Sequence, residues 1–266
     1  MTNRPLILAI KGDARQTYAV QSLKGYFNTT ETQFPLSGAA SADILLLPML
    51  TKNGSFEGLS KHLRPGALVL GGRIPPGLRA SFASNGYEVA DYYESPSLKL
   101  QNALPTAEGV LMLAMQNTPG IVSFTSVLIT GFGACAKQTA RMFSALGCKV
   151  CIAARSPAAR AEAEAYGYKT AEISSIKNII SHADIIVNTV PSQIIGEKEL
   201  AASKQQALFI EIASAPFGID ESAAQTLGRK LINAPGLPAK CAPKTSGEYI
   251  ARAVRDIIIK RKEGEP

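Results

Sequence analysis

The sequence predicts an α/β protein made of two Rossmann-like, doubly wound parallel-sheet domains with a cleft between them. Short apolar runs alternate with helix-like stretches along all 266 residues, a pattern that indicates parallel strands joined by helices. A glycine-rich turn at 131–133 stands between an apolar run and a helix-like stretch, as the first turn of such a domain requires. The length suffices for two domains, each with its own hydrophobic core.

The first domain is expected over residues 1–101. Apolar runs bounded by Gly or Pro are typical of buried strands. The clear runs in this part are Leu6–Ile10, Ile44–Leu47, Ala67–Leu70 and Tyr87–Ala90, with a weaker one near Tyr26. A helix beginning near Arg15 is predicted to follow the first strand.

The second domain is expected over residues 102–245. It opens with a helix that we expect to begin at Pro105 and to be buried between the domains, because 107–115 is apolar on nearly every side. Strands are then predicted at Val127–Thr130, Lys149–Ala153, near Lys169, and at Asp184–Asn188, Leu208–Ile212 and Leu231–Asn233. A final helix, from about Ser246 to Arg261, is expected to return to the first domain, so that 246–266 belong with 1–101.

Composition excludes several classes of protein. The chain has two histidines, His62 and His182, so a multi-histidine metal site is excluded, and no metal is expected. No apolar run approaches the length of a membrane span or a signal segment, which predicts a cytoplasmic protein that does not bind membranes. Cys148 and Cys151 form a C-x-x-C on a predicted strand, where small core residues are a better interpretation than a redox pair.

The glycine-rich turn predicts a dinucleotide site. Residues 127–136 read V-L-I-T-G-F-G-A-C-A, the G-x-G-x-x-A form of the fingerprint, placed between a strand and a helix. Gly131 would allow the tight turn, Gly133 the close approach of backbone to a pyrophosphate, and Ala136 the close packing of helix on strand. The contacts expected here are Gly131, Phe132, Gly133, Ala134 and Cys135.

The end of the next strand distinguishes the two nicotinamide cofactors. NAD sites place Asp or Glu there, but no carboxylate lies between Gly131 and Arg160. Arg155, Ser156 and Arg160 can instead bind a 2′-phosphate, so we expect NADP. The alternative is that the two arginines belong to a solvated helix start.

Three further strand ends are expected to contribute cofactor contacts, because ligands bind outside the carboxyl ends of parallel strands. The residues concerned are Asn188, Thr189, Val190 and Pro191, then Ala213, then Pro235, Gly236 and Leu237. The Asn188 side chain is expected to line the ribose and nicotinamide. Structural turns are the alternative at each place.

These motifs together resemble the A subunits of dipicolinate synthase, a family of spore-forming bacteria. They are G-D-A-R-Q at 12–16, N-A-L-P-T-A-E-G at 102–109, the glycine-rich motif, A-A-R-S at 153–156, N-T-V-P-S at 188–192, E-I-A-S at 211–214 and A-P-G-L-P…A-P-K-T within 234–245. The resemblance implies an oxidoreductase in which NADP takes a hydride from a dihydrodipicolinate, itself formed from 4-hydroxy-tetrahydrodipicolinate. It also implies that the flavoprotein-like B subunit of dipicolinate synthase is the partner and that the protein acts in the mother-cell cytoplasm, and we expect a homo-oligomer.

Such a dicarboxylate substrate would need cations and hydrogen-bond donors. Arg15, Arg73 and Lys244 are predicted to clamp its carboxylates, and Thr106 to donate a hydrogen bond. Asp13, at the end of the first strand, is the expected proton acceptor. Surface roles are the alternative for the cations, and a turn-forming role for Asp13.

Three other functions stay open. The first is a dehydrogenase acting on 2-hydroxy or 2-amino acids, although no histidine follows His182 to act as its base. The second is an NADP-binding regulatory subunit without chemistry of its own. The third, nucleic-acid binding, rests only on a net charge of +7, because the sequence shows no basic stripe and no aromatic platform.

Overall fold

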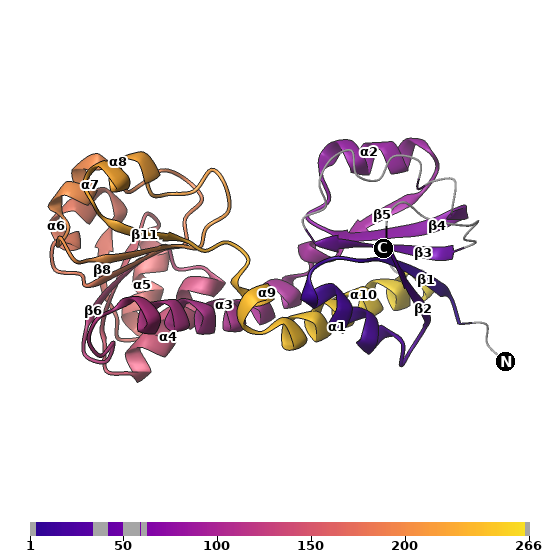
Figure 1. The fold of residues 1–266 in the computed structure, drawn as a ribbon, viewed down its shortest axis with the longest axis horizontal. Helices are drawn as coiled ribbons and strands as arrows, with labels where there is room; N and C mark the ends of the chain where they lie inside the picture. The colour runs from indigo at the N-terminus through magenta and orange to yellow at the C-terminus, as the bar shows by residue number, and fades with distance from the viewer. Residues whose placement is uncertain (1–3, 34–41, 50–58, 60–62, 264–266) are drawn as a thin grey trace. The chain divides into compact units, whose positions relative to one another are not determined.

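The computed structural model describes residues 4–33, 42–49, 59 and 63–263 (Figure 1). The chain forms two compact units, Met1–Asn102 with Ala242–Pro266, and Ala103–Cys241. Each unit contains one sheet, and every strand pair in both sheets is parallel. The predicted fold class, two Rossmann-like α/β domains, is confirmed.

The first unit contains a five-stranded sheet in the order β2-β1-β3-β4-β5. Its strands are β1 (Leu6–Ile10), β2 (Asn28–Thr32), β3 (Ala42–Met49), β4 (Leu63–Gly72) and β5 (Glu88–Asp91). Its helices are α1 (Ala14–Leu23), α2 (Pro76–Ser84) and the long C-terminal α10 (Pro243–Glu263), with a short 3-10 turn at Tyr92–Glu94.

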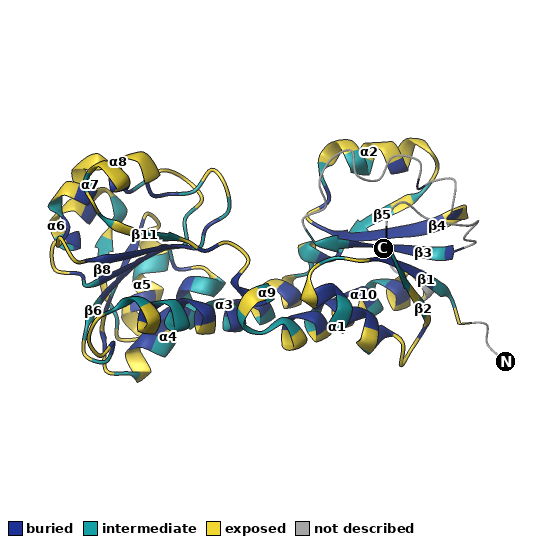
Figure 2. Ribbon diagram, in the orientation of Figure 1, coloured by how far each residue is buried: buried dark blue, intermediate teal, exposed yellow. Residues whose placement is uncertain are grey.

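Helices cover both faces of this sheet. On one face, apolar residues of α1 and α10 pack with β1, β3 and β4, and the backbones approach so closely that a Cβ on Gly247 would lie 2.5 Å from the Arg15 carbonyl oxygen. On the other face Phe82 of α2 joins a second apolar cluster. The three central strands β1, β3 and β4 are largely buried, whereas the edge strands β2 and β5 are partly exposed (Figure 2).

The second unit contains a six-stranded sheet in the order β11-β10-β9-β6-β7-β8. Its strands are β6 (Ser126–Thr130), β7 (Lys149–Ala154), β8 (Lys169–Glu172), β9 (Ile185–Asn188), β10 (Leu208–Glu211) and β11 (Lys230–Asn233). Its helices are α4 (Ala134–Ala145), α5 (Pro157–Ala165), α6 (Ile176–Ile180), α7 (Glu197–Ala202), α8 (Glu221–Thr226) and α9 (Leu237–Cys241), with a 3-10 turn at Ile173–Ser175. Helix α3 (Pro96–Asn117) begins in the first unit and continues in the second.

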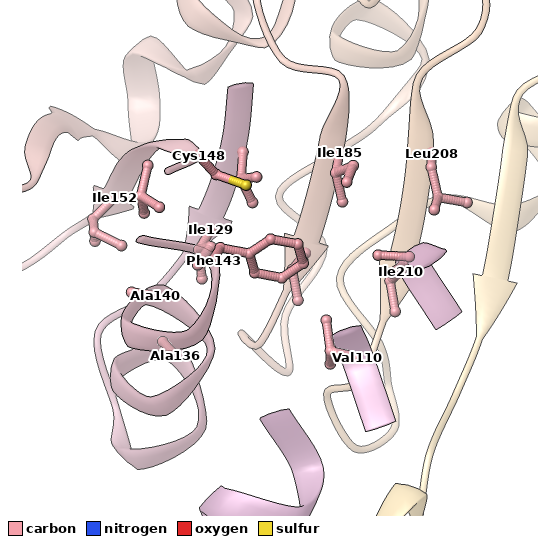
Figure 3. Packing of buried hydrophobic residues seen from close by; sticks show 14 of the residues in the cluster. Val110, Ile129, Ala136, Ala140, Phe143, Cys148, Ile152, Ile185, Leu208 and Ile210 are labelled. Carbon is pink, nitrogen blue, oxygen red and sulfur yellow. The ribbon is translucent and has the colours of Figure 1, made fainter. Parts of the chain in front are cut away.

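Two apolar clusters lie on opposite faces of this sheet. The larger one joins the strands to α3, α4, α5 and α9, and Figure 3 shows the Phe143 ring of α4 among Ile129, Ile185 and Val110. The smaller one joins the strands to the short helices α6, α7 and α8. The first turn of α4 is thereby fixed at the carboxyl end of β6.

Helix α3 corrects one predicted boundary. It begins at Pro96, not at Pro105, and Pro105 lies inside it. Ser95 accepts a hydrogen bond from the Leu98 amide at 3.4 Å, so Ser95-Pro96 supplies the capping residue and first-turn proline expected at Pro105. The short helices α7, α8 and α9, of five or six residues, escaped prediction because one turn and a half shows no hydrophobic period.

The cysteines are not paired with one another. Cys148 is buried just before β7 and its thiol donates to the Val122 carbonyl oxygen at 3.2 Å, while burial raises the pKa of Cys151. The described part of the chain contains no group of three or more metal-ligating side chains. Among the same residues, no helix is both long and apolar enough to cross a membrane. His62 lies outside the described residues.

Candidate functional site

A cavity of about 430 Å³ opens in the second unit at the carboxyl ends of the strands. The strand order reverses between β6 and β9, and it is at such a reversal that doubly wound sheets bind ligands. The described lining residues follow four strands: Gly131 and Phe132 after β6, Ala154, Arg155, Ser156 and Ala159 at β7, Ile173 after β8, and Val190, Pro191, Ser192 and Ile194 after β9.

The glycine-rich turn has the geometry that a dinucleotide requires. Gly131 adopts a φ of 77°, and a Cβ there would lie 2.9 Å from Thr189 Oγ1, so both conformation and space favour glycine. Gly133 is the N-cap of α4, and no atom lies within 4 Å of where its Cβ would be. No side chain caps this helix, so its first amide groups are not satisfied by a capping side chain. A phosphate would fit here, bound by those amides and by the positive end of the helix dipole.

The end of β7 presents a cation and a hydroxyl to the cavity. Arg155 and Ser156 are both exposed and both line it. Ser156 Oγ accepts a hydrogen bond from the Ala159 amide at 3.4 Å as N-cap of α5, which leaves its hydroxyl hydrogen able to donate to a ligand. No carboxylate is among the described lining residues.

Arg160 is not among the described residues that line the cavity. Its Nη1 donates to the carbonyl oxygens of Ala154 and Arg155, at 2.8 and 2.9 Å. Through Nη1 the guanidinium caps the end of β7 and supports the backbone of Arg155. A phosphate contact through its other N–H groups stays a prediction.

Asn188 requires a correction. Its side chain is fully buried and donates to both carboxylate oxygens of Glu211, at 2.8 and 2.7 Å, while its Oδ1 accepts from Thr130 Oγ1 at 2.5 Å. The prediction that the Asn188 side chain lines the ribose is therefore wrong for this structure, because the side chain has these partners and no exposed surface. Of the four cofactor contacts expected at the end of β9, Val190 and Pro191 line the cavity.

The other predicted cofactor residues lie near strand ends but outside the cavity lining. Thr189 Oγ1 donates to the Thr130 carbonyl oxygen at 2.6 Å, and the Ala213 amide donates to Glu211 at 2.8 Å. Leu237 is a buried core residue. The remaining ones are Ala134 and Cys135 in the first turn of α4, and the exposed pair Pro235 and Gly236 after β11. Their roles stay predictions.

Four apolar lining residues were not among the predicted contacts. They are Ala154, Ala159, Ile173 and Ile194. An adenine ring needs flat apolar contact, which many side chains supply, so no motif identifies these positions as contacts. Ile173 stands directly after β8, and its place at a strand end was the one signal that pointed to it.

The first unit has its own reversal of strand order, between β1 and β3. Arg15 is buried there and binds Asp13 through Nε and Nη2, the shortest contact being 2.5 Å, while its Nη1 lies 3.1 Å from Met49 Sδ. Burial raises the pKa of Asp13, but the hydrogen bonds and charge of Arg15 outweigh it and hold this pKa below its ordinary value.

This ion pair corrects two predicted roles. An aspartate with a lowered pKa and its oxygens bound by a guanidinium is a poor proton acceptor. The Arg15 edge that would hold a substrate carboxylate is already occupied by Asp13. In this structure Asp13 also caps α1 by accepting from the Arg15 amide, so the pair stabilises the turn after β1.

The other predicted substrate residues are differently placed. Arg73 follows β4, is exposed, has a φ of 55°, and stacks on the Tyr93 ring with 4.4 Å between guanidinium carbon and ring centre. Asp91 accepts from the Arg73 and Ile74 amides and so holds this turn. Lys244 is exposed in the first turn of α10, and Thr106 is half-buried within α3. Their contact with substrate stays a prediction.

Comparison with known proteins agrees with this geometry. Residues 114–237 match the model of the family described as D-isomer specific 2-hydroxyacid dehydrogenase, NAD binding domain. That range contains all six strands of the second unit. The second unit is therefore similar to the nicotinamide-dinucleotide-binding domains of dehydrogenases, which supports an oxidoreductase with a nicotinamide cofactor.

Relatives over more of the chain share one name. The dipicolinate synthase A subunit of Bacillus subtilis (strain 168) is 34% identical over 175 residues, which are 65% of this chain and 59% of that relative. The solved structure of the same subunit from Bacillus halodurans covers 96% of this chain and is itself covered to 97%, with 25% identity and a TM-score of 0.85. For the solved Bacillus subtilis structure the shares are 100% and 99%, again with 25% identity and a TM-score of 0.85.

This chain is similar in sequence and in fold to the dipicolinate synthase A subunits. The resemblance inferred from the motifs is thus confirmed. The name of these relatives marks each as one subunit of a larger enzyme. The sequence alignment spans 59% of the Bacillus subtilis relative, less than two thirds of its length.

Proposed function

We propose that this chain is the NADP-dependent subunit of a dipicolinate synthase and oxidises dihydrodipicolinate to dipicolinate. One observation carries the proposal beyond the homology: β7 ends in Arg155 and Ser156 at the cavity, with no carboxylate among the described lining residues. A 2′-phosphate is bound by such a pair, whereas the ribose hydroxyls of NAD are bound by an acidic side chain. The resemblance further supports a role in spore formation, in the mother-cell cytoplasm.

The proposed reaction removes a hydride and a proton from the substrate ring. Dihydrodipicolinate and NADP⁺ give dipicolinate, NADPH and one proton; the bound nicotinamide supplies the hydride acceptor. Because the product ring is aromatic, the reaction is favoured without a strong base. This agrees with an Asp13 whose oxygens are taken up by Arg15.

For the substrate carboxylates we propose Arg73 and Lys244, with Thr106 as a hydrogen-bond donor. Arg73 offers a guanidinium at the carboxyl end of β4, held in place by its stacking on Tyr93. Fixed cations of this kind act by positioning and neutralising the dicarboxylate, with little covalent chemistry. Pairing with the flavoprotein-like B subunit of dipicolinate synthase and assembly into a homo-oligomer complete the proposal.

One assay tests the activity. The purified protein is mixed with NADP and enzymatically generated 4-hydroxy-tetrahydrodipicolinate, with and without the B subunit, and NADPH absorbance is followed. NADPH and dipicolinate formation in either mixture supports the proposal. If neither mixture forms them while the protein binds NADPH, a regulatory role is the better interpretation.

Arg155→Glu tests the choice of cofactor. A carboxylate at this position repels a 2′-phosphate, so the Michaelis constant or dissociation constant for NADP should rise by at least about tenfold while that for NAD changes little. Arg141→Glu, an exposed arginine further along α4, is the matched charge reversal and should leave the ratio unchanged. Equal effects of Arg155→Glu on both cofactors would contradict the assignment.

The family match favours a second candidate, a dehydrogenase acting on 2-hydroxy acids. Such an enzyme needs an acid–base group near the nicotinamide. His182, the last histidine of the chain, stands just before β9, at the opposite edge of the sheet from the cavity. Turnover of 2-hydroxy acids with NAD or NADP, without dipicolinate formation, would favour this candidate.

A further inference from the structure

Glu211, at the end of β10, is a buried carboxylate whose hydrogen-bond partners in the described structure are all uncharged. It has no exposed surface. Oε1 accepts from the Ala213 amide at 2.8 Å, and Oε2 accepts from the amides of Gly218 and Ile219 at 2.8 and 3.1 Å. Both oxygens also face Asn188 Nδ2, at 2.8 and 2.7 Å. A buried carboxylate is costly unless its acceptors are satisfied, and here amide donors satisfy them.

Asn188 connects Glu211 by hydrogen bonds to Val190, which lines the cavity. Its Nδ2 donates to the Val190 carbonyl oxygen at 3.0 Å, and its Oδ1 accepts from the Val190 amide at 3.1 Å. Both polar groups of the Val190 backbone are therefore held by one side chain, which Glu211 and Thr130 hold in turn. Val190 lines the cavity, and its Cγ2 would lie 3.1 Å from a Cβ on Gly131.

Gly218 connects Glu211 by hydrogen bonds to a second lining residue, Ile194. Its amide donates to Glu211, and its carbonyl oxygen accepts from the amides of Ile194 and Ile195 at 2.9 and 3.0 Å. Ile194 lines the cavity. No side chain fits at 218, because a Cβ there would lie 2.3 Å from Asn188 Nδ2. The carboxylate, the Asn188 amide and the Gly218 backbone thus form one close-packed unit beneath the cavity.

We propose that Glu211 is the positioning residue of the dinucleotide site. It lies outside the cavity lining and acts through Asn188 and Gly218, which hold Val190 and Ile194 where the cofactor would pack. This inference rests on the proposed dinucleotide binding. Four N–H donors converge on the two oxygens, so a glutamine at 211 would turn one acceptor into a donor facing other donors, and the wall would shift.

The test is Glu211→Gln, with Asp184→Asn as the matched control. Asp184 stands at the opposite edge of the same sheet and accepts from the Ser126 amide at 2.8 Å and from Lys204 Nζ at 2.6 Å. Each substitution removes a charged acceptor that joins β9 to a neighbouring strand: Glu211 of β10 accepts from Asn188 of β9, and Asp184, just before β9, accepts from the amide of Ser126 in β6. Both substitutions should therefore lower the melting temperature. The dissociation constant of NADPH is measured by fluorescence titration, at a temperature where each variant is fully folded.

We expect Glu211→Gln to weaken NADPH binding about tenfold or more and Asp184→Asn less than about twofold. Thr130→Val removes the hydroxyl that donates to Asn188 and accepts from the Thr189 amide at 3.3 Å. It should weaken binding by a smaller factor, and it is the test variant if the Glu211 variant does not fold. Wild-type affinity in the foldable variants, or an equal loss in Asp184→Asn, would overturn the positioning role while leaving the proposed function intact. A wild-type protein that binds neither NADPH nor NADH would overturn both.

Discussion

Gly133→Ala should weaken binding of the dinucleotide while leaving the stability of the fold nearly unchanged. Gly133 has a φ of −79°, ordinary for any residue, and no atom lies within 4 Å of where its Cβ would be. The protein without ligand therefore has room for alanine. A pyrophosphate bound at the α4 N-terminus would fill that room, since the dinucleotide fingerprint uses its second glycine for close approach.

The substitution should change the free energy of unfolding much less than the free energy of binding. Two small effects on the free energy of unfolding oppose each other: alanine is a poorer N-cap than glycine, but it restricts the unfolded chain by about 0.4–1 kcal/mol. The net change in stability should be within about 1 kcal/mol. Loss of one charge-assisted hydrogen bond to phosphate costs about 1.5–3 kcal/mol, which corresponds to roughly 10- to 150-fold weaker binding.

Urea unfolding and NADPH fluorescence titration measure the two quantities on the same samples. Gly120→Ala is the control, because Gly120 also has open space around it, lacks a positive φ and belongs to the same unit. It should leave the NADPH affinity unchanged. Affinity of Gly133→Ala equal to that of the wild type would refute the placement of the pyrophosphate at this turn.

Two further predictions concern stability. Phe143→Ala removes a fully buried ring from the larger cluster of the second unit and should cost about 3–5 kcal/mol, seen as a lower urea midpoint for the unfolding of that unit; a loss below about 1 kcal/mol would contradict the packing in Figure 3. The folded-state pKa of Asp13 lies below its ordinary value of 3.8, so its ion pair with Arg15 stabilises the fold above that pH, and this stabilisation is lost as pH falls through the folded-state pKa. Asp13→Asn should therefore lower the melting temperature at neutral pH and flatten its fall with acid, and an unchanged acid profile would count against the ion pair.

Patterns local in the chain predicted most of the architecture. Apolar runs such as Leu6–Ile10 and Val127–Thr130 located strands to within a residue or so, because a strand buried on both faces is apolar at every position. Local patterns failed at Pro105. A proline in the first turn of a helix fits a start at Pro96 as well as one at Pro105, and only the cap at Ser95 shows that the helix begins at Pro96. The glycine-rich turn was predicted because the glycines that its backbone conformation requires are close together in the sequence.

The roles of single side chains were predicted less well, since they depend on partners distant in the sequence. Asn188 and Arg160 have residue types that suit a cofactor, yet Glu211 and the end of β7 engage them. Arg15 and Asp13 are only two residues apart in the sequence. Whether they bind each other or the substrate depends on the burial of Arg15, which the sequence does not show.

The sequence by itself determined the strands, the dinucleotide turn and the cation at the end of β7, because each depends on neighbours along the chain. Only the tertiary structure decided which polar groups face the cavity and which face each other. Parallel strands bring Thr130, Asn188 and Glu211 to one edge from positions up to 81 residues apart. Once there, burial leaves these groups no water to bind, so they bond to one another and hold the wall of the site.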